Sequence, residues 1–396
     1  MASSDKPLDL EPRGVTPAGV TRGRTFSRRA VNSLGAWRSD GAARWVFIWP
    51  SVVVILCLSI FPLVASLTLA FSKLVFLKGQ VDIDWVGFNN FSILIFGTER
   101  THLLGLLRPP TPLGWVVFGI AIALVGRALV RSVRSGPRRP IGVALRIASA
   151  MIVVGLVWLV VQTLFSEGGR PGSLVVTIVY VVAGIGVQYV LGLGLAILAV
   201  QPLRGRRFFR VVFLLPLTIT PVGVGYMFRM MTDTGKGPLE PLFGALGLTG
   251  YTWVTDPWAA RVAVIIGDAW QWTPFVFIVL LAALEGLDQE VKEAAFVDGA
   301  SQWQSFRHIT IPAILPVSTT IVLIRLIEGF KIVDMPNILT GGGPGTATQS
   351  LTLQAYLDWR TLNLGRSAAI AYILLILVTF IATAYVGWVR RRTEPA

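Results

Sequence analysis

Long apolar runs separated by short charged segments recur along almost the whole chain of 396 residues. Each run has about 20 residues, the length that a helix needs to cross a hydrocarbon core about 30 Å thick. Because a backbone in lipid must satisfy its own hydrogen bonds, such continuous runs favour helices over the alternating strands of a barrel. We therefore predict an all-α, polytopic transmembrane helical bundle. Its expected spans, about eight, are 45–71, 113–133, 141–165, 174–200, 209–231, 259–284, 311–332 and 367–389.

The positions of the arginines predict the orientation of these spans. Arginines are frequent in the arm 1–44, and they recur at 134–140, at 201–208 and in the tail 391–396. Positive charge beside a span marks the cytoplasmic side, so both termini are expected in the cytoplasm. The pair of spans at 113–165 could be removed without changing the orientation of the others.

Composition agrees with a membrane protein and excludes several other classes. Hydrophobic residues make up 54% of the chain and charged residues 14%, whereas soluble domains carry roughly 25% charged residues. The net charge of +14 does not indicate nucleic-acid binding, because no basic face with interleaved aromatic residues is present. Cys57 is the only cysteine, so neither a disulfide nor a thiolate metal site can form within the chain. We expect no metal site.

The loop between the sixth and seventh spans is expected to form two short helices with a break. Asp288 can cap the first helix, and Gly299 permits a sharp turn. Ser301 and Gln304 have the spacing of a capping box at the start of the second helix. Such a hairpin is either a plain surface connection or a docking element.

The same loop resembles the signature of the binding-protein-dependent importer permeases, E-A-A-x-x-D-G-A followed by a hydrophobic residue and I-x-L-P. Ile311 stands where leucine is usual. Two further segments, 207–216 and 324–345, resemble the carbohydrate-importing branch of this family, which includes the maltose and glycerol-phosphate permeases. The residues that match the signature, which the resemblance assigns to coupling with an ATPase, are Glu293, Ala294, Ala295, Asp298, Gly299, Ala300, Phe306, Ile309 and Pro312.

The resemblance implies a six-span permease core with an inserted transmembrane hairpin, in the inner membrane of a bacterial cell. The expected organisation is a cytoplasmic basic arm 1–44, a first core span 45–71, an external loop 72–173 that carries the hairpin 113–165, a core 174–390 with the coupling loop 285–312, and a tail 391–396. The expected partners are a second permease subunit, two cytoplasmic ATPase subunits, an external solute-binding protein and membrane lipid. No G-x-x-x-x-G-K-[ST] sequence occurs, so the chain should bind no cofactor and be no enzyme, with ATP and magnesium on the partner ATPase.

Ionisable residues within two spans are candidates for the solute pathway, since such residues usually face a cavity or a partner. Arg325, Glu328 and Lys331 recur every three residues, which predicts one helical face. Glu328 could instead form a structural salt bridge with Arg325 or Lys331. In the preceding span, Gln271 and Trp272 offer an amide and an aromatic face to a sugar. The resemblance places solute contacts in these two spans, which makes Gln271, Trp272, Glu328 and Lys331 the candidates.

The function that these features predict is import of a sugar or related polyhydroxylated solute, passed from the external binding protein to the cytoplasm by alternating access. Two alternatives remain at this point. Arg325 and Lys331 could hold a phosphorylated or otherwise charged solute. A secondary transporter acting alone would need no docking hairpin.

Overall fold

The computed structural model describes residues 40–77, 80–135, 140–202, 204–233, 236–247 and 255–393. The chain divides into two units, Met1–Val64 and Ala65–Ala396, and each is considered by itself. The expected arm therefore lies almost wholly outside the described residues, as do the last three residues of the tail.

The first apolar run forms α2 (Asp40–Ile55), a π-helical turn η1 (Leu56–Ile60) and α3 (Phe61–Ala70), and its candidate span is Ile48–Ala70. The π turn has a local cause in Pro62, which directly follows Phe61. A proline donates no hydrogen bond, and its ring crowds the carbonyl four residues earlier, here that of Leu58. A widened turn around Leu58 relieves this contact without breaking the helix.

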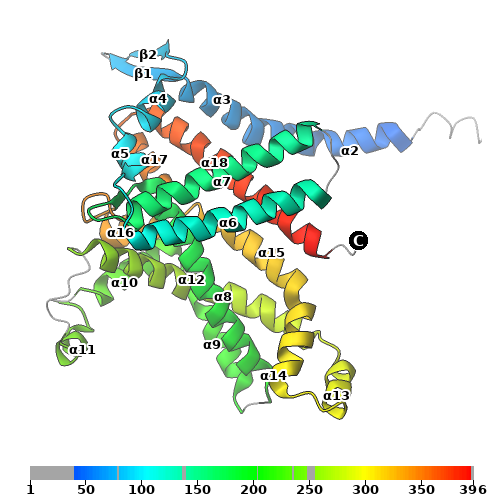
Figure 1. Cartoon of the computed structure of the whole chain (residues 1–396). Helices are drawn as coiled ribbons and strands as arrows, with labels where there is room; N and C mark the ends of the chain where they lie inside the picture. Colours follow the sequence, from blue (N-terminus) through cyan, green and yellow to red (C-terminus); the bar gives the residue numbers. More distant parts are fainter. Residues whose placement is uncertain are drawn as a thin grey trace, which may run out of the picture. The chain divides into compact units, whose positions relative to one another are not determined.

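The second unit is built mainly from long apolar helices (Figure 1). The described residues contain seven helices that could cross a membrane, or up to eight if a bent pair counts as one span. This confirms the expected polytopic helical bundle. The long helices of the second unit are α6 (Pro112–Ser135), α7 (Pro140–Leu164), α8 (Ser173–Val200), α12 (Pro257–Glu285), α15 (Ile311–Gly329) and α18 (Leu364–Thr393).

The expected span 209–231 is not one straight helix. It consists of α9 (Arg206–Thr218) and α10 (Pro221–Met231), which meet at an angle of 99°. Ile219 and Thr220 are extended, because the residue before a proline avoids the helical region. The Thr220 hydroxyl accepts a hydrogen bond from the Gly223 amide at 3.3 Å and so caps α10. The prediction of a continuous span was wrong at this point.

The shorter elements connect the spans. Two small antiparallel sheets, which the all-α expectation did not include, pair β1 with β2 and β3 with β4. The short helices and strands are β1 (Ser72–Leu77), β2 (Gln80–Trp85), α4 (Asn89–Ile95), α5 (Arg100–Leu103), β3 (Gly105–Leu106), β4 (Arg170–Pro171), α11 (Glu240–Ala245), α13 (Gln289–Val297), α14 (Gln302–Ser305), η2 (Phe306–Thr310), α16 (Asp334–Thr340) and α17 (Leu351–Arg360).

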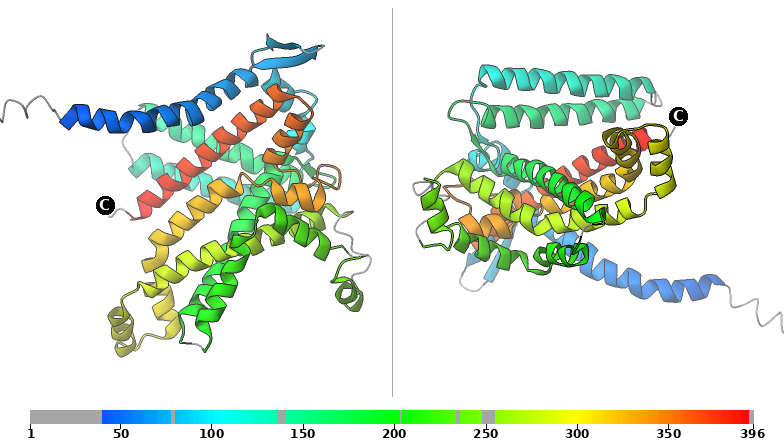
Figure 2. Two further views of the ribbon diagram at one scale, coloured as in Figure 1. Left: turned by 180° about the vertical axis from the view of Figure 1, so that it is seen from behind. Right: turned by 90° about the horizontal axis from the view of Figure 1, so that it is seen from below.

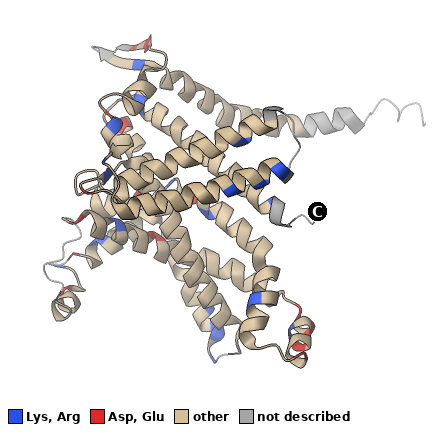
Figure 3. Cartoon of the chain, in the orientation of Figure 1, with Lys and Arg blue, Asp and Glu red and all other residues tan. Residues whose placement is uncertain are grey.

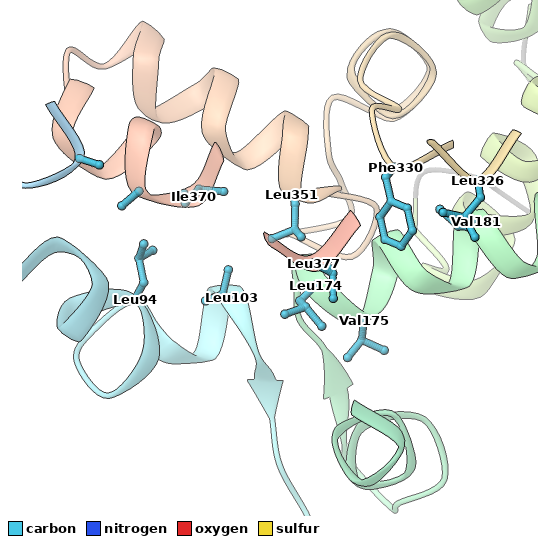
Figure 4. Packing of buried hydrophobic residues seen from close by; sticks show 12 residues of the cluster. Leu94, Leu103, Leu174, Val175, Val181, Leu326, Phe330, Leu351, Ile370 and Leu377 are labelled. Carbon is cyan, nitrogen blue, oxygen red and sulfur yellow. The ribbon is translucent and has the colours of Figure 1, made fainter. Parts of the chain in front are cut away.

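Buried apolar side chains join one end of α8 and α18 to the short helices around them (Figure 4). Leu94 and Leu103 come from α4 and α5, and Leu351 comes from α17. Each of these three side chains is at most 1% exposed. The elements between spans are therefore packed onto the helices and form part of the core.

The inserted hairpin runs as two helices, α6 and α7, that lie side by side along one flank of the second unit (Figure 2). The rings of Trp115, Phe118 and Trp158 pack together at one end, with Phe118 and Trp158 4.6 Å apart. The hydroxyl of Thr111 donates to the Phe165 carbonyl at 2.9 Å and closes that end. The hairpin expected at 113–165 is thus a pair of helices with its own aromatic contact.

Helices α8 and α12 form the central packing of the second unit. Gly192 is buried on α8, and a side-chain carbon at that position would lie 2.7 Å from Val276 Cγ1 and 3.1 Å from the Phe277 backbone nitrogen. Gly194, two residues further along, has open space around it and is exposed. Small residues let helix backbones approach closely in membranes. Gly192 therefore serves the close contact between α8 and α12, and Gly194 does not.

We predict that Gly192→Ala destabilises the protein, because the added methyl group meets the backbone of α12. Overpacking of this kind costs typically 1–3 kcal/mol. Gly194→Ala is the matched control, which should be neutral or slightly stabilising because alanine favours helix more than glycine does. Thermal unfolding of both variants in detergent checks this expectation. Equal melting temperatures for the two variants would contradict the close contact.

Candidate functional site

The loop that carries the family signature is a structured hairpin of α13 and α14. The Asp288 carboxylate accepts the Glu290 amide at 3.0 Å and caps the start of α13. The end of α13 has the two hydrogen bonds of a Schellman motif, Ala300 N–H to Ala295 C=O at 2.9 Å and Gly299 N–H to Phe296 C=O at 3.0 Å. Gly299 takes φ +82°, with no atom near the place of a side chain. The expected cap and turn are both confirmed.

The second helix of the hairpin begins with the expected capping box. The Gln304 amide donates to the Ser301 hydroxyl at 3.3 Å, and the Ser301 amide donates to the Gln304 side chain at 2.8 Å. This helix is not a separate short element, however. It continues through η2 into α15, so that the candidate span is Gln302–Gly329. Pro312 explains the π turn η2 in the way that Pro62 explains η1.

Apolar side chains project from this hairpin. Val297 is 88% exposed and Trp303 is 66% exposed, and Val291 and Phe296 are about half exposed. Acidic residues also lie on α13, as the red segments of this helix in Figure 3 show. A projecting apolar surface with polar neighbours is typical of a protein interface. The hairpin therefore has the character of a docking element.

The signature residues are divided between the surface of the hairpin and its base. Glu293, Ala294, Asp298, Gly299 and Pro312 are exposed. The other four signature residues are half buried, namely Ala295, Ala300, Phe306 and Ile309.

A second polar feature lies between the spans. Arg325 of α15 donates from Nε to the Gln188 side chain of α8 at 2.8 Å, and from Nη2 to Asp268 of α12 at 3.2 Å. Gln188 in turn donates to the same Asp268 oxygen at 2.7 Å. The guanidinium lies over the Trp272 ring, 4.3 Å from its centre. We call Gln188, Asp268, Trp272 and Arg325 the polar cluster.

Because the polar cluster is buried, its side chains depend on one another for hydrogen bonds and charge pairing. Arg325 is 1% exposed, Gln188 0% and Asp268 9%. A buried charge is tolerated when it is paired and hydrogen-bonded, and here each charge depends on a side chain from another helix. The cluster therefore fixes α8, α12 and α15 relative to one another.

The four expected pathway residues differ in their surroundings. Trp272 is half buried beneath Arg325, whereas Gln271 is 4% exposed and donates to the Ile219 carbonyl at the break between α9 and α10, at 3.3 Å. Glu328 pairs with Lys331 at 2.6 Å on the surface. Arg325 and Glu328 lie on one helix as expected, but α15 ends at Gly329, so the prediction that Lys331 continues their helical face is wrong. The structural salt bridge considered for Glu328 is present with Lys331.

Sequence reasoning missed the partner of Arg325. Asp268 is an acid within one span and Arg325 lies within another, so their pairing could have been proposed from the cost of isolated charges in lipid. Gln188 gave no such signal, because a single glutamine in an apolar helix is compatible with many roles. The structure brings the three together at 3.2 Å or less.

We predict that Asp268→Ala strongly destabilises the protein, since it leaves the Arg325 guanidinium buried without a counter-charge. Breaking one side of a buried pair costs about 3–5 kcal/mol. Glu328→Ala is the matched control, because it breaks an exposed pair worth roughly 0–1 kcal/mol. Yield and thermal stability of the purified variants measure the difference. A stable Asp268→Ala protein would show that the cluster is dispensable for folding.

Comparison with known proteins agrees with this architecture. Residues 188–395 match the family described as binding-protein-dependent transport system inner membrane component. The trehalose/maltose transport system permease protein MalF of Thermococcus litoralis is 32% identical over 221 residues, which are 55% of this chain and 75% of the relative. The sulfoquinovosyl glycerol transport system permease protein SmoG of Agrobacterium fabrum is 30% identical over 205 residues, 51% of this chain and 66% of the relative.

A solved structure shares the fold. A crystal structure of a bacterial ABC transporter involved in the import of the acidic polysaccharide alginate aligns with a TM-score of 0.57, covering 93% of this chain and 100% of that chain at 18% identity. The matched family region contains the α13–α14 hairpin and every residue of the polar cluster. The chain therefore belongs to the family of binding-protein-dependent transport system inner membrane components, and it is a permease subunit of an ABC importer, not an enzyme.

Proposed function

We propose that this permease imports a sugar or a related polyhydroxylated solute, which an external binding protein delivers. The observation that carries the importer assignment is the α13–α14 hairpin, whose signature residues sit on a capped turn with projecting apolar side chains. The relatives named for trehalose/maltose and for sulfoquinovosyl glycerol support a solute of the sugar class.

The charges near the expected pathway favour an uncharged solute over an anionic one. Arg325 is neutralised by Asp268 and is 1% exposed, so it offers no free cation to a phosphate or carboxylate. Lys331 is paired with Glu328. Gln271, Trp272, Glu328 and Lys331 together offer amide, aromatic and ion-pair groups, which suit the hydroxyls and the apolar face of a sugar. Their contact with the solute is a proposal.

The orientation that we propose places the α13–α14 hairpin and both chain termini in the cytoplasm. Arg204, Arg206, Arg207 and Arg210 lie where α8 and α9 join, and positive charge beside a span favours that side. Arg210 also pairs with Glu285 at 2.5 Å, near the start of the hairpin. Two ATPase subunits, which hold ATP and magnesium, would dock there, while a second permease subunit completes the pathway within the membrane.

The proposed mechanism is alternating access driven by those ATPases. Helix α14 runs through η2 into α15 without interruption, and α15 carries Arg325 of the polar cluster. A displacement of the hairpin is therefore transmitted along one helix to the point where α8, α12 and α15 are joined. Coupling requires that the ATPase interacts differently with the two states of the permease.

We predict that Gly299→Val abolishes transport and that Gly299→Asn largely retains it. The added side chain meets no atom at this position, so the only obstacle is the φ of +82°. A β-branched residue is a severe outlier there, whereas asparagine tolerates this conformation. Glu293→Ala should act more mildly, since a hydrogen bond to a charged group contributes about 1.5–3 kcal/mol.

The measurement is uptake into proteoliposomes, together with ATP hydrolysis stimulated by loaded binding protein and co-purification of the ATPase. Insertion of each variant into the membrane is the control. Normal coupling in Gly299→Val would show that the loop is a plain connector. Equal loss in the valine and asparagine variants would instead show that the conformation of the turn is not what matters.

A further inference from the structure

A cavity of about 660 Å³ lies where the inserted hairpin meets the core. Residues at the end of α7 and in the following turn form one wall, including Ser166 and Arg170. The start of α12 forms another wall with Trp258 and Arg261, and the segment 344–347 forms the third. In the proposed orientation these ends face the outside. None of the expected pathway residues lines this cavity.

Arg261 is a buried cation that forms no salt bridge within the described residues, although the charge of Asp256 acts on it from further away. It is 3% exposed, its Nε donates to the Ala347 carbonyl at 2.8 Å, and its guanidinium lies 4.8 Å from the centre of the Trp258 ring. Within the ranges that the structure describes, no carboxylate lies within 4.0 Å of it. The nearby Asp256 instead accepts the Ala259 amide at 2.6 Å and caps α12.

The contrast with Arg325 shows what Arg261 lacks. Arg325 is equally buried and has both an acid and an amide as partners. Within the described residues Arg261 has a backbone carbonyl, an aromatic face and the more distant charge of Asp256. A buried charge needs pairing to offset its lost hydration. The Nη groups of Arg261 make no hydrogen bond to any described residue, and they line a cavity large enough for a ligand group.

Two further polar side chains that have no partner among the described residues line the same cavity. Arg170 is exposed at its rim and forms no ion pair with a described residue. The Thr346 hydroxyl makes no hydrogen bond within the described part of the chain. Two guanidinium groups and a hydroxyl match the needs of an oxyanion, which accepts several charge-assisted hydrogen bonds.

We propose that this cavity binds a phosphate group, with Arg261 as the buried anchor and Arg170 at the rim. The phosphate can belong to the headgroup of an anionic phospholipid or to a free anion. The place of the cavity, at the ends of two membrane helices, suits a headgroup. Occupancy would join the inserted hairpin to α12 and to the 344–347 segment, which gives the insertion a binding function separate from the solute pathway.

The test uses the full chain, purified with the subunits that accompany it and stripped of lipid. Thermal stability is measured with inorganic phosphate against chloride at equal ionic strength, and retention of phosphatidylglycerol against phosphatidylcholine is measured by native mass spectrometry. We expect stabilisation by phosphatidylglycerol or phosphate in the unaltered protein. The apparent affinity should fall at least tenfold in Arg261→Gln and in Arg170→Gln.

Arg360→Gln is the matched control, because Arg360 is an exposed arginine on α17 that packs on Tyr356 outside the cavity. If Arg261→Gln does not fold, Arg170→Gln still provides the test, because Arg170 is exposed and forms no ion pair with a described residue. Preference for phosphatidylglycerol without a response to phosphate identifies a lipid site, and a response to phosphate alone identifies a free anion. No response to either, or an equal loss in Arg360→Gln, would overturn the proposal.

Discussion

The pairing of Arg325 with Asp268 and Gln188 is the constraint on which the arrangement of the core depends. Each of the three side chains comes from a different membrane helix, and each would be costly to leave alone in a medium without water. Apolar packing between such helices gives little directional preference, because lipid tails are as apolar as leucine. The charge pair therefore selects one rotation of α8, α12 and α15, and Gly192 allows α8 and α12 to approach closely.

The α13–α14 hairpin and this cluster are joined by one continuous helical segment, Gln302–Gly329. The capping box at Ser301 starts a helix that continues to Gly329, with a single π turn before Pro312. Caps and a Schellman turn make the hairpin rigid at the end that we propose to meet the ATPase. Through the salt bridge at Arg325, near the other end of this helix, a movement of α15 would also displace α8 and α12. This connection explains why a docking loop and a buried ion pair occur in one chain.

Local features of the chain could be predicted from its sequence, whereas the rotation of the helices could not. Asp288, Gly299 and Ser301 act through neighbours a few residues away, so their roles follow from spacing alone. Pro221 offers a local reason for the break between α9 and α10, which the expected span 209–231 did not include, but a bend of 99° also depends on the helices around it. The face to which Arg325 points, and the end of α15 before Lys331, depend on tertiary contacts. For the same reason no sequence pattern identified Gln188 as part of the cluster.

Cross-linking from the tip of the hairpin tests most directly whether this end of the permease meets an ATPase. Val297 is 88% exposed, and Val297→Cys in a Cys57→Ser background provides a single reactive thiol. A short bifunctional reagent should join this thiol to the co-purifying ATPase in isolated membranes. A cysteine at the exposed Thr361, at the opposite end of the spans, should give no such product. An adduct with the ATPase from Thr361→Cys and none from Val297→Cys would contradict the account.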